Sequence, residues 1–371
     1  MIYKEYGKTG IKLSKIGFGG MRFDDQDDVE KCASLIYSIY YAGVNYFDTA
    51  PGYEKSEDLF GVALKEMKKT RAERPFYIST KTAKENPADV RKDLETSLKR
   101  MNLDYIDFYH VWCLVTPEQY QRRKANGVLK EFEKLKEEGL IKHICVSTHM
   151  TGFEIGDMLN DYPFEGVLLG YSAMNFSYRE AGLDSAAKLN RGVVVMNPLG
   201  GGLITQHPNR FDFVRTQENE TIVEGALRFL FNDPRITVAL VGMGNENHLK
   251  DAIRAVNGFK PIKSEKIETI RSSLKGSFNE LCTGCRYCDH CPEGIPVPKM
   301  MESYNHLMLS GKTKDLVDRL YWHWGITTDD DYSSQCVECG QCEEECTQIL
   351  PIINRLKEIQ NEIEKYLTDK N

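Results

Sequence analysis

Eight of the eleven cysteines lie beyond residue 280, in two short runs with the spacing of metal ligands. The first run is Cys282, Cys285, Cys288 and Cys291, followed by Pro292, and the second is Cys336, Cys339, Cys342 and Cys346. Three thiolates separated by two residues can hold three corners of a [4Fe–4S] cluster, and the fourth cysteine typically ligates the other cluster of a pair. The spacing therefore predicts two [4Fe–4S] clusters.

The exchange of the fourth cysteine defines the expected ligand sets. One cluster takes Cys282, Cys285, Cys288 and Cys346, and the other takes Cys336, Cys339, Cys342 and Cys291. Structural zinc is the alternative, because paired C-x₂-C motifs also bind zinc. A zinc ion needs only four ligands and gains nothing from a third cysteine at the same spacing, so the pattern favours iron–sulfur.

A second chemically active group consists of Asp48, Tyr53 and Lys81. Asp48 and Lys81 stand at the carboxyl ends of two apolar runs, and Tyr53 follows five residues after Asp48. A phenol with a pKa near 10 is a weak proton donor at neutral pH unless a neighbouring charge stabilises its anion. Lys81 would lower the pKa of Tyr53, and Asp48 would hold the Lys81 ammonium in place. Singly, each residue also fits a structural role; jointly they predict catalysis.

The elements that must position these residues are short apolar runs, which alternate with helical patterns up to about residue 255. Alternation of strands and helices predicts parallel βα units, and eight such units match a closed (β/α)8 TIM barrel. Active sites of these barrels lie at the carboxyl ends of the strands, where Asp48 and Lys81 stand. The eight expected strands are Leu13–Gly19, Asn45–Thr49, Phe76–Lys81, Tyr105–Trp112, Ile141–Ser147, Val167–Ala173, Gly192–Asn197 and Ile236–Gly242.

An open doubly wound sheet is the competing α/β fold. It would carry a glycine fingerprint after its first strand, and Gly17-Phe18-Gly19-Gly20 does not complete that pattern. The barrel is therefore favoured. The segment Tyr3–Leu13, with Lys8-Thr9-Gly10 at its centre, predicts a small hairpin ahead of the first strand.

The sequence predicts two domains, a barrel over residues 1–258 and a small α-helical domain over residues 259–371 that is organised around metal. Helical patterns in the second domain cover Ser264–Leu281, Lys299–Tyr321 and Ile352–Tyr366, and no strand alternation follows residue 258.

Composition narrows the environment and the partners. The 48 basic and 55 acidic residues leave a net charge of −7 with no long basic tract, which argues against nucleic acid as a partner. No apolar run resembles a signal peptide or reaches the length of a membrane span, so we expect no membrane association. Thiolates held by metal rather than in disulfides predict a reducing, cytoplasmic location.

The segments Asn45–Tyr53 and Ile78–Lys81 resemble the signature of the aldo-keto reductases, and the resemblance continues to the Gly242-Met243-Gly244-Asn245 turn. With its cysteine-rich C-terminal region, the chain resembles the subgroup that carries a C-terminal ferredoxin-like domain. The resemblance implies reduction of an aldehyde or ketone by hydride from NADP(H) or NAD(H), with Tyr53 as proton donor. Members of the family usually end the fourth barrel strand with a histidine; here Trp112 stands at that position and His110 lies two residues earlier.

The resemblance also implies a set of nucleotide-binding residues at the strand ends. Ser147 and Thr148 resemble the pair that binds the nicotinamide carboxamide, and Pro198–Gly202 resembles the loop over the pyrophosphate. The phosphate end of the nucleotide would meet the helix after the eighth strand, where Glu246 stands instead of a basic residue. The full expected set is Ser147, Thr148, Asn175, Asn197, Leu199, Gly242, Asn245 and His248.

Two further functions stay open beside the carbonyl reductase. A hydride carries two electrons whereas an iron–sulfur cluster passes one, so the chain could instead be an electron-transfer relay with a redox partner protein. It could also be a nucleotide-binding redox sensor with little turnover. Retention of Asp48, Tyr53 and Lys81 favours the reductase, acting on a small-molecule carbonyl substrate.

Overall fold

The computed structural model divides the chain into two compact units. The first contains Met1–Leu199 and Asp212–Lys275, and the second contains Gly200–Phe211 and Gly276–Asn371. The sequence placed a single division after residue 258 and did not anticipate that Gly200–Phe211 groups with the C-terminal region. The structure describes the chain except for residues 175, 218, 262, 264, 266, 268–279, 328–331, 333 and 369–371.

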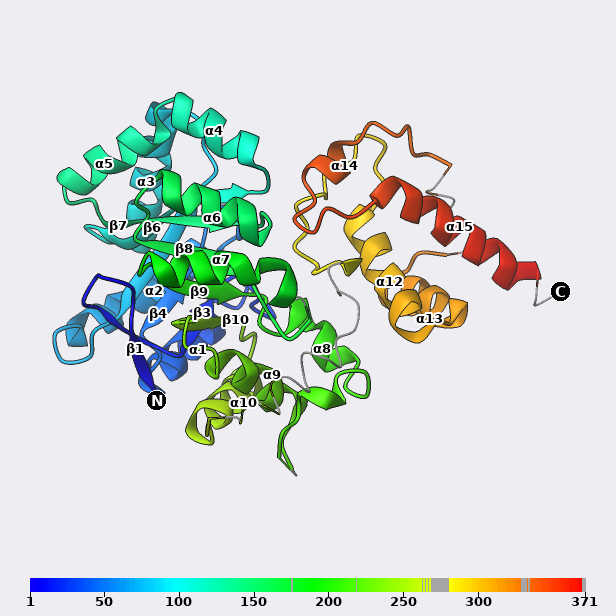
Figure 1. Cartoon of the computed structure of the whole chain (residues 1–371), viewed down its shortest axis with the longest axis horizontal. Coiled ribbons are helices and arrows are strands. Elements are labelled where there is room, and N and C mark those ends of the chain that lie inside the picture. The colour runs from blue at the N-terminus through cyan, green and yellow to red at the C-terminus, as the bar shows by residue number, and fades with distance from the viewer. Residues whose placement is uncertain are drawn as a thin grey trace. The chain divides into compact units, whose positions relative to one another are not determined.

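The first unit is built on a closed barrel of parallel strands in the order β10-β3-β4-β5-β6-β7-β8-β9 (Figure 1). The predicted (β/α)8 barrel is confirmed, and the open sheet is wrong. Each of the eight expected apolar runs supplies one strand. The strands are β3 (Ile16–Gly19), β4 (Tyr46–Asp48), β5 (Tyr77–Thr82), β6 (Ile106–Leu114), β7 (Ile141–Thr148), β8 (Gly166–Gly170), β9 (Gly192–Met196) and β10 (Val238–Val241).

Helices follow the strands and surround the barrel (Figure 1). Side chains cap the first turns of several of them, as in the capping box of α6, in which Thr151 and Glu154 satisfy each other's backbone N–H groups. The α-helices are α1 (Val29–Tyr41), α2 (Ser56–Met67), α3 (Pro87–Met101), α4 (Pro117–Ala125), α5 (Val128–Glu137), α6 (Gly152–Asp161), α7 (Phe176–Lys188), α9 (Ile222–Phe231) and α10 (Glu246–Asn257). Short 3-10 turns cover Lys68–Thr70 and Asp212–Val214.

The predicted N-terminal hairpin is present and closes the bottom of the barrel. Strands β1 (Tyr3–Glu5) and β2 (Lys12–Ser14) pair antiparallel, and Tyr6 follows β1 with no exposed surface. The Tyr6 ring packs edge-on against Phe108 at 4.8 Å between centroids. It also lies against Gly166 and Gly192, the first residues of β8 and β9, where a Cβ would collide with the ring. Tyr6 therefore fills the space that side chains at these two strand starts would occupy.

The second unit is helical, as predicted for the C-terminal domain. Its core gathers apolar side chains such as Met300, Leu316 and Ile359 together with Cys282 and Cys346. The helices are α8 (Leu203–Gln206), α12 (Val297–Ser310), α13 (Thr313–Asp318), α14 (Gln341–Glu344) and α15 (Ile352–Thr368), with a 3-10 turn at Gly200–Gly202 and a π-helical turn at Arg319–His323. Most of the helix predicted over Ser264–Leu281 lies outside the described residues.

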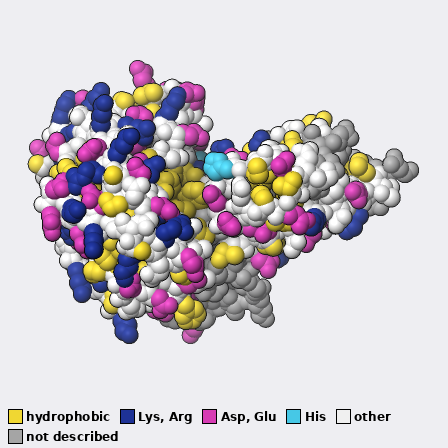
Figure 2. Space-filling view, turned by 90° about the horizontal axis from the view of Figure 1, so that it is seen from above, with side chains coloured by type: hydrophobic (Ala, Val, Ile, Leu, Met, Phe, Trp, Pro, Cys, Tyr) yellow, Lys and Arg dark blue, Asp and Glu magenta, His cyan; other side chains and the backbone are white. Residues whose placement is uncertain are grey.

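The surface mixes charges of both signs. Figure 2 shows Lys and Arg side chains interspersed with Asp and Glu on the face in view, in keeping with the net charge of −7. Among the described residues, no helix is both long enough and apolar enough to cross a membrane.

Substitution of Tyr6 by Ala should lower the free energy of unfolding by about 3–5 kcal/mol, because it removes a large buried ring from between rigid strand starts. Tyr6→Phe should cost about 1 kcal/mol, since only the contact between the hydroxyl and Cys145 Sγ, 3.7 Å away, is lost. Urea unfolding followed by circular dichroism measures both. Tyr3→Ala, at a residue 48% exposed, is the control. If Tyr6→Ala and Tyr3→Ala lost the same free energy of unfolding, Tyr6 would not be filling the space at the strand starts.

Candidate active site

A buried ion pair forms the centre of the candidate site. Lys81, near the carboxyl end of β5, places Nζ 2.5 Å from Asp48 Oδ1 at the end of the neighbouring strand β4. Both side chains are buried, with at most 1% exposed. The Ser79 hydroxyl donates to the second oxygen, Asp48 Oδ2, at 2.7 Å. Both carboxylate oxygens of Asp48 therefore have partners, and the ammonium is held in one position.

Burial lowers the pKa of Lys81 because it penalises the charged ammonium, and the Asp48 carboxylate opposes this shift. The Asp48 carboxylate, acting against burial, therefore favours the positive charge on Lys81 that the predicted catalytic set requires.

Tyr53 lies beside this pair. Lys81 Nζ is 5.1 Å from the centroid of the Tyr53 ring, within the range of a cation–π contact. The structure thus brings Asp48, Tyr53 and Lys81 together. The ring of Trp112 stands edge-on to the Tyr53 ring, at 5.7 Å and 90°, so an indole borders the phenol where the family usually has an imidazole.

Trp112 reaches this position through an irregularity in β6. The register between β6 and β7 shifts between Val111 and Leu114, and Cys113 has a positive φ of 55°. The Arg123 guanidinium donates to the carbonyl oxygen of Trp112 and holds the bulge. Trp112 remains half-buried. Its indole can donate one hydrogen bond but cannot accept or relay a proton.

His110 lies deeper in the barrel, opposite Lys81 in the β5–β6 ladder and fully buried. Burial, and then the charge of the nearby Lys81, lower the pKa of His110 to about 3. His110 is therefore neutral at physiological pH. It belongs to the barrel interior, as expected, rather than to the set that faces a substrate.

The expected nicotinamide residues end strand β7. Ser147 is buried there. The Thr148 hydroxyl donates to the Leu114 carbonyl at 2.9 Å and accepts from the Met150 N–H at 3.1 Å. Thr148 therefore has a clear structural role beside its predicted one. Asn175 lies outside the described residues.

Asn197 and Leu199 follow β9 and lead to the turn Gly200–Gly202. Asn197 takes a positive φ of 55°, a left-handed conformation that asparagine tolerates better than most residues. Both residues thus lie just beyond the carboxyl end of β9, where the predicted nucleotide-binding set requires them.

The turn Gly242–Asn245 opens helix α10. The Asn245 side chain caps the helix by accepting from the N–H groups of Asn247 and His248, and it donates to Asp24 at 2.9 Å. His248 Nδ1 accepts from the Gly244 N–H at 3.1 Å. Both predicted residues therefore hold the helix N-terminus in place. A cavity of about 330 Å³ adjoins it, bordered by three carboxylates, Asp24, Asp25 and Glu246, and one ammonium, Lys31.

The eight C-terminal cysteines form two groups. Burial, and then the neighbouring thiols of Cys285 and Cys346, raise the pKa of Cys282 to about 12. Burial, and then the thiols of Cys282, Cys285 and Cys346, raise the pKa of Cys288. Burial, followed by the charge of Glu343 and the thiols of Cys336, Cys291 and Cys339, raises the pKa of Cys342 to about 11. The thiols thus influence one another in the two sets that the sequence spacing predicts.

The surroundings of these sulfurs suit iron–sulfur clusters. The Gly284 and Leu350 N–H groups donate to the sulfurs of Cys282 and Cys346, each at 3.4 Å, and such hydrogen bonds help to set cluster potentials. In the described part of the chain, no three His, Cys, Asp or Glu side chains lie close enough to hold a single metal ion.

Three supporting residues were missed from the sequence. Ser79 binds Asp48, Arg123 holds the β6 bulge, and Asn305 on α12 clamps the Cys282 backbone. Ser79 could have been found, because it lies two residues before Lys81 and so faces the same side of its strand. Arg123 and Asn305 act through tertiary contacts that leave no local signal.

Comparisons with known proteins agree with both units. The aldo/keto reductase family model matches residues 15–275, and the 4Fe-4S dicluster domain model matches residues 281–350. L-galactose dehydrogenase of Arabidopsis thaliana is 25% identical over 288 residues, 67% of this chain and 86% of the relative. NADH-specific methylglyoxal reductase of Escherichia coli is 28% identical over 224 residues, 54% of this chain and 68% of the relative. The holo structure of an aldo-keto reductase from Bacillus halodurans shares the fold with a TM-score of 0.63 at 21% identity, over 74% of this chain and 97% of that one.

The buried histidines should make stability depend on pH. Because His110 and His149 both have pKa values lowered to about 3 by burial, the unfolded chain binds more protons than the folded chain between pH 6.5 and 3, and stability falls as pH falls through this range. His110→Gln should therefore lose about 1.4 kcal/mol less unfolding free energy than the wild type between pH 7.5 and 5.5. Anaerobic urea unfolding at the two pH values measures this. An equal loss in both proteins would mean that His110 is charged in the folded state.

Proposed function

Because the chain belongs to the aldo/keto reductase family, whose members are oxidoreductases that use nicotinamide cofactors, and carries a 4Fe-4S dicluster domain, we propose that it reduces an aldehyde or ketone with Tyr53 as proton donor. The observation that carries this proposal is the buried Lys81–Asp48 pair beside the Tyr53 ring. The substrate is a small-molecule carbonyl compound.

Each residue of the set has one task. When bound, the reduced nicotinamide supplies hydride to the carbonyl carbon. Tyr53 Oη donates its proton to the carbonyl oxygen as the alkoxide forms. Lys81 stabilises the phenolate left on Tyr53, and Asp48 keeps the ammonium aligned. Trp112 narrows the space beside Tyr53, which favours small or flat carbonyl groups.

The nucleotide takes the strand-end residues that the family resemblance implies. Ser147 and Thr148 serve the carboxamide, the segment after β9 covers the pyrophosphate, and the N-terminus of α10 receives the adenosine end. We expect NADH rather than NADPH, because Asp24, Asp25 and Glu246 surround the cavity at α10 and would repel a 2′-phosphate. The Escherichia coli relative described as NADH-specific is in keeping with this preference.

The second unit carries two [4Fe–4S] clusters. The partition of the thiols into two sets of four supports this number. Because hydride moves two electrons together and each cluster passes one, the clusters take no part in the hydride step. They stabilise or modulate the enzyme.

One observation favours a second candidate function, an electron relay to a redox partner protein. Cys339, one of the second set of ligands, is exposed, and the neighbouring Val337 is 61% exposed. An exposed ligand next to an apolar side chain suits brief docking of an electron-transfer partner.

Tyr53→Phe should lower kcat for carbonyl reduction about 10²- to 10⁴-fold, because it removes the proton donor and keeps the ring that Lys81 contacts. NADH oxidation with a panel of aldehydes and ketones, measured anaerobically, tests this. Cluster absorbance should be unchanged, and Tyr41→Phe, at an exposed tyrosine of α1, should retain full activity. Undiminished turnover of Tyr53→Phe would overturn the assignment. Tight nucleotide binding without turnover in the wild type would favour the relay or the sensor.

The wild type should have a kcat/KM for NADH at least tenfold that for NADPH. Glu246→Lys should shift this ratio toward NADPH by about tenfold or more, since it replaces a repulsive charge by an attractive one near the α10 N-terminus. Glu246→Gln is the matched control and should give a smaller shift. A wild-type preference for NADPH would contradict the expected repulsion.

A further inference from the structure

The backbone of Trp112 is held by a buried arginine. Arg123 on α4 is 6% exposed, and its guanidinium donates to the carbonyl oxygen of Trp112. Its Nε lies 3.9 Å from the Glu85 carboxylate, to which the neighbouring Arg122 donates hydrogen bonds of 2.7 and 3.0 Å. The head group of Arg123 is thus confined between a backbone carbonyl and a carboxylate that is itself held.

The held carbonyl lies in the bulge of β6. The residues of β6 that pair with β7 on either side of the bulge are Val111 and Leu114. Between them, Trp112 and Cys113 oppose a single residue of β7, Ser147. A bulge changes the direction in which side chains leave a strand, so the direction of the Trp112 ring depends on how this segment is held.

The Trp112 ring contacts the loop that carries Tyr53. It stands edge-on to the Tyr53 ring, with centroids 5.7 Å apart, and a Cβ on Gly52 would lie only 2.9 Å from Trp112 Cη2. Lys81 Nζ lies 5.1 Å from the centroid of the same Tyr53 ring. The phenol is therefore bordered by both the indole and the ammonium, and its setting depends on Trp112 staying in place.

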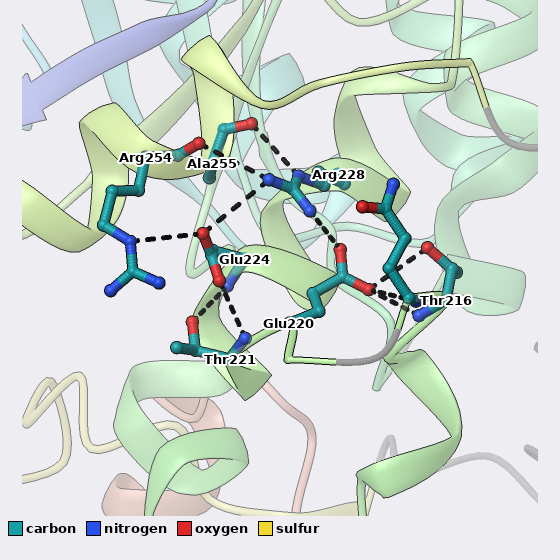
Figure 3. Close-up of polar contacts among 8 residues, drawn as sticks. Thr216, Glu220, Thr221, Glu224, Arg228, Arg254 and Ala255 are labelled. Carbon is teal, nitrogen blue, oxygen red and sulfur yellow. Dashed lines mark hydrogen bonds and ion pairs between the residues drawn. The ribbon is translucent and has the colours of Figure 1, made fainter.

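A buried arginine that donates to a backbone carbonyl recurs elsewhere in the first unit. Arg228 on α9 donates to the carbonyl oxygen of Ala255 on α10 at 3.2 Å and pairs with Glu220 at 2.7 Å (Figure 3). These helices precede and follow β10, which lies four strands from β6 around the barrel. Arg228 thus fixes two helices to each other, whereas the same kind of contact at Arg123 fixes the residue beside Tyr53.

We propose that Arg123 is a positioning residue that keeps the Trp112 indole against Tyr53, and that this wall restricts the substrate to carbonyl compounds that are unbranched beside the carbonyl group. A quaternary carbon next to the carbonyl is bulky on every side, whereas an unbranched chain can present a narrow edge to the indole. The inference rests on the proposed function, in which Tyr53 protonates the carbonyl oxygen. Arg123 acts through Trp112 and is not a catalytic residue.

The test compares butanal with 2,2-dimethylpropanal as substrates of the full-length protein, kept anaerobic with NADH or NADPH in excess. The ratio of their kcat/KM values measures the preference, and the intrinsic difference between the aldehydes cancels when proteins are compared. Arg123→Gln should lower the wild-type ratio by about tenfold or more, because the released indole can move aside. Arg123→Lys should retain most of the preference, since its ammonium can still donate to the Trp112 carbonyl.

Two control variants separate positioning from a general loss of structure. Arg228→Gln removes a buried arginine that also donates to a backbone carbonyl, and it should lower stability while leaving the ratio unchanged. Arg122→Gln removes the adjacent guanidinium, whose side chain is 52% exposed, and it should leave the ratio unchanged as well. A ratio that falls equally in Arg123→Gln and Arg228→Gln would overturn the proposal, because loosening of the barrel would then explain the change.

Fluorescence of Trp112 gives a readout that needs no substrate. The chain has three tryptophans, so the signal of Trp112 is the difference between each protein and the same protein with Trp112→Phe. The acrylamide quenching constant of this signal should rise about twofold or more in Arg123→Gln, because the released indole is more open to solvent. In Arg228→Gln it should match the wild type.

The outcomes distinguish this inference from the proposed function. Absence of aldehyde and ketone turnover in the wild type would refute the proposed function, and the quenching constants would then decide whether Arg123 holds Trp112. Turnover with an unchanged ratio in Arg123→Gln would overturn the inference and leave the reductase standing. If Arg123→Gln does not fold, Arg123→Met, which keeps an apolar stem and removes the donor, takes its place with the same expected result.

Discussion

The active site depends on the removal of one ion pair from water. Lys81 and Asp48 lie inside the barrel with almost no exposed surface, and burial of two charges costs several kcal/mol each unless their hydrogen bonds are satisfied. The geometry meets this requirement with the Ser79 hydroxyl on the second oxygen of Asp48 and with a neutral His110 beside Lys81. A charged imidazole at that point would repel the ammonium. The neutrality of His110 is therefore a condition for the pair as well as a result of burial.

Much of this arrangement follows from local sequence patterns. Apolar runs of strand length located all eight barrel strands, and the rule that barrel sites lie at the carboxyl ends of strands brought Asp48, Tyr53 and Lys81 together. The cysteine spacing predicted a division into two sets of four, and the electrostatic neighbours of Cys282, Cys288 and Cys342 fall into those sets. These features succeed because the information lies within a few residues.

Features that depend on distant partners were not predicted. The sequence around Tyr6 does not reveal that Gly166 and Gly192, 160 and 186 residues further along the chain, leave room for its ring. The bulge that turns Trp112 toward Tyr53 depends on Arg123 in the following helix. The grouping of Gly200–Phe211 with the second unit likewise requires Thr283 and His306, which no local pattern connects to a loop after the seventh barrel strand.

That grouping has a consequence for the order of folding during synthesis. The ribosome completes Gly200–Phe211 some seventy residues before Cys282 and about a hundred before His306. The barrel strands can therefore close while this segment still lacks the surface on which it finally rests. The last part of the barrel sequence to reach its native contacts is then an interior one, and it must wait for the Cys282 segment and α12 of the second unit to emerge.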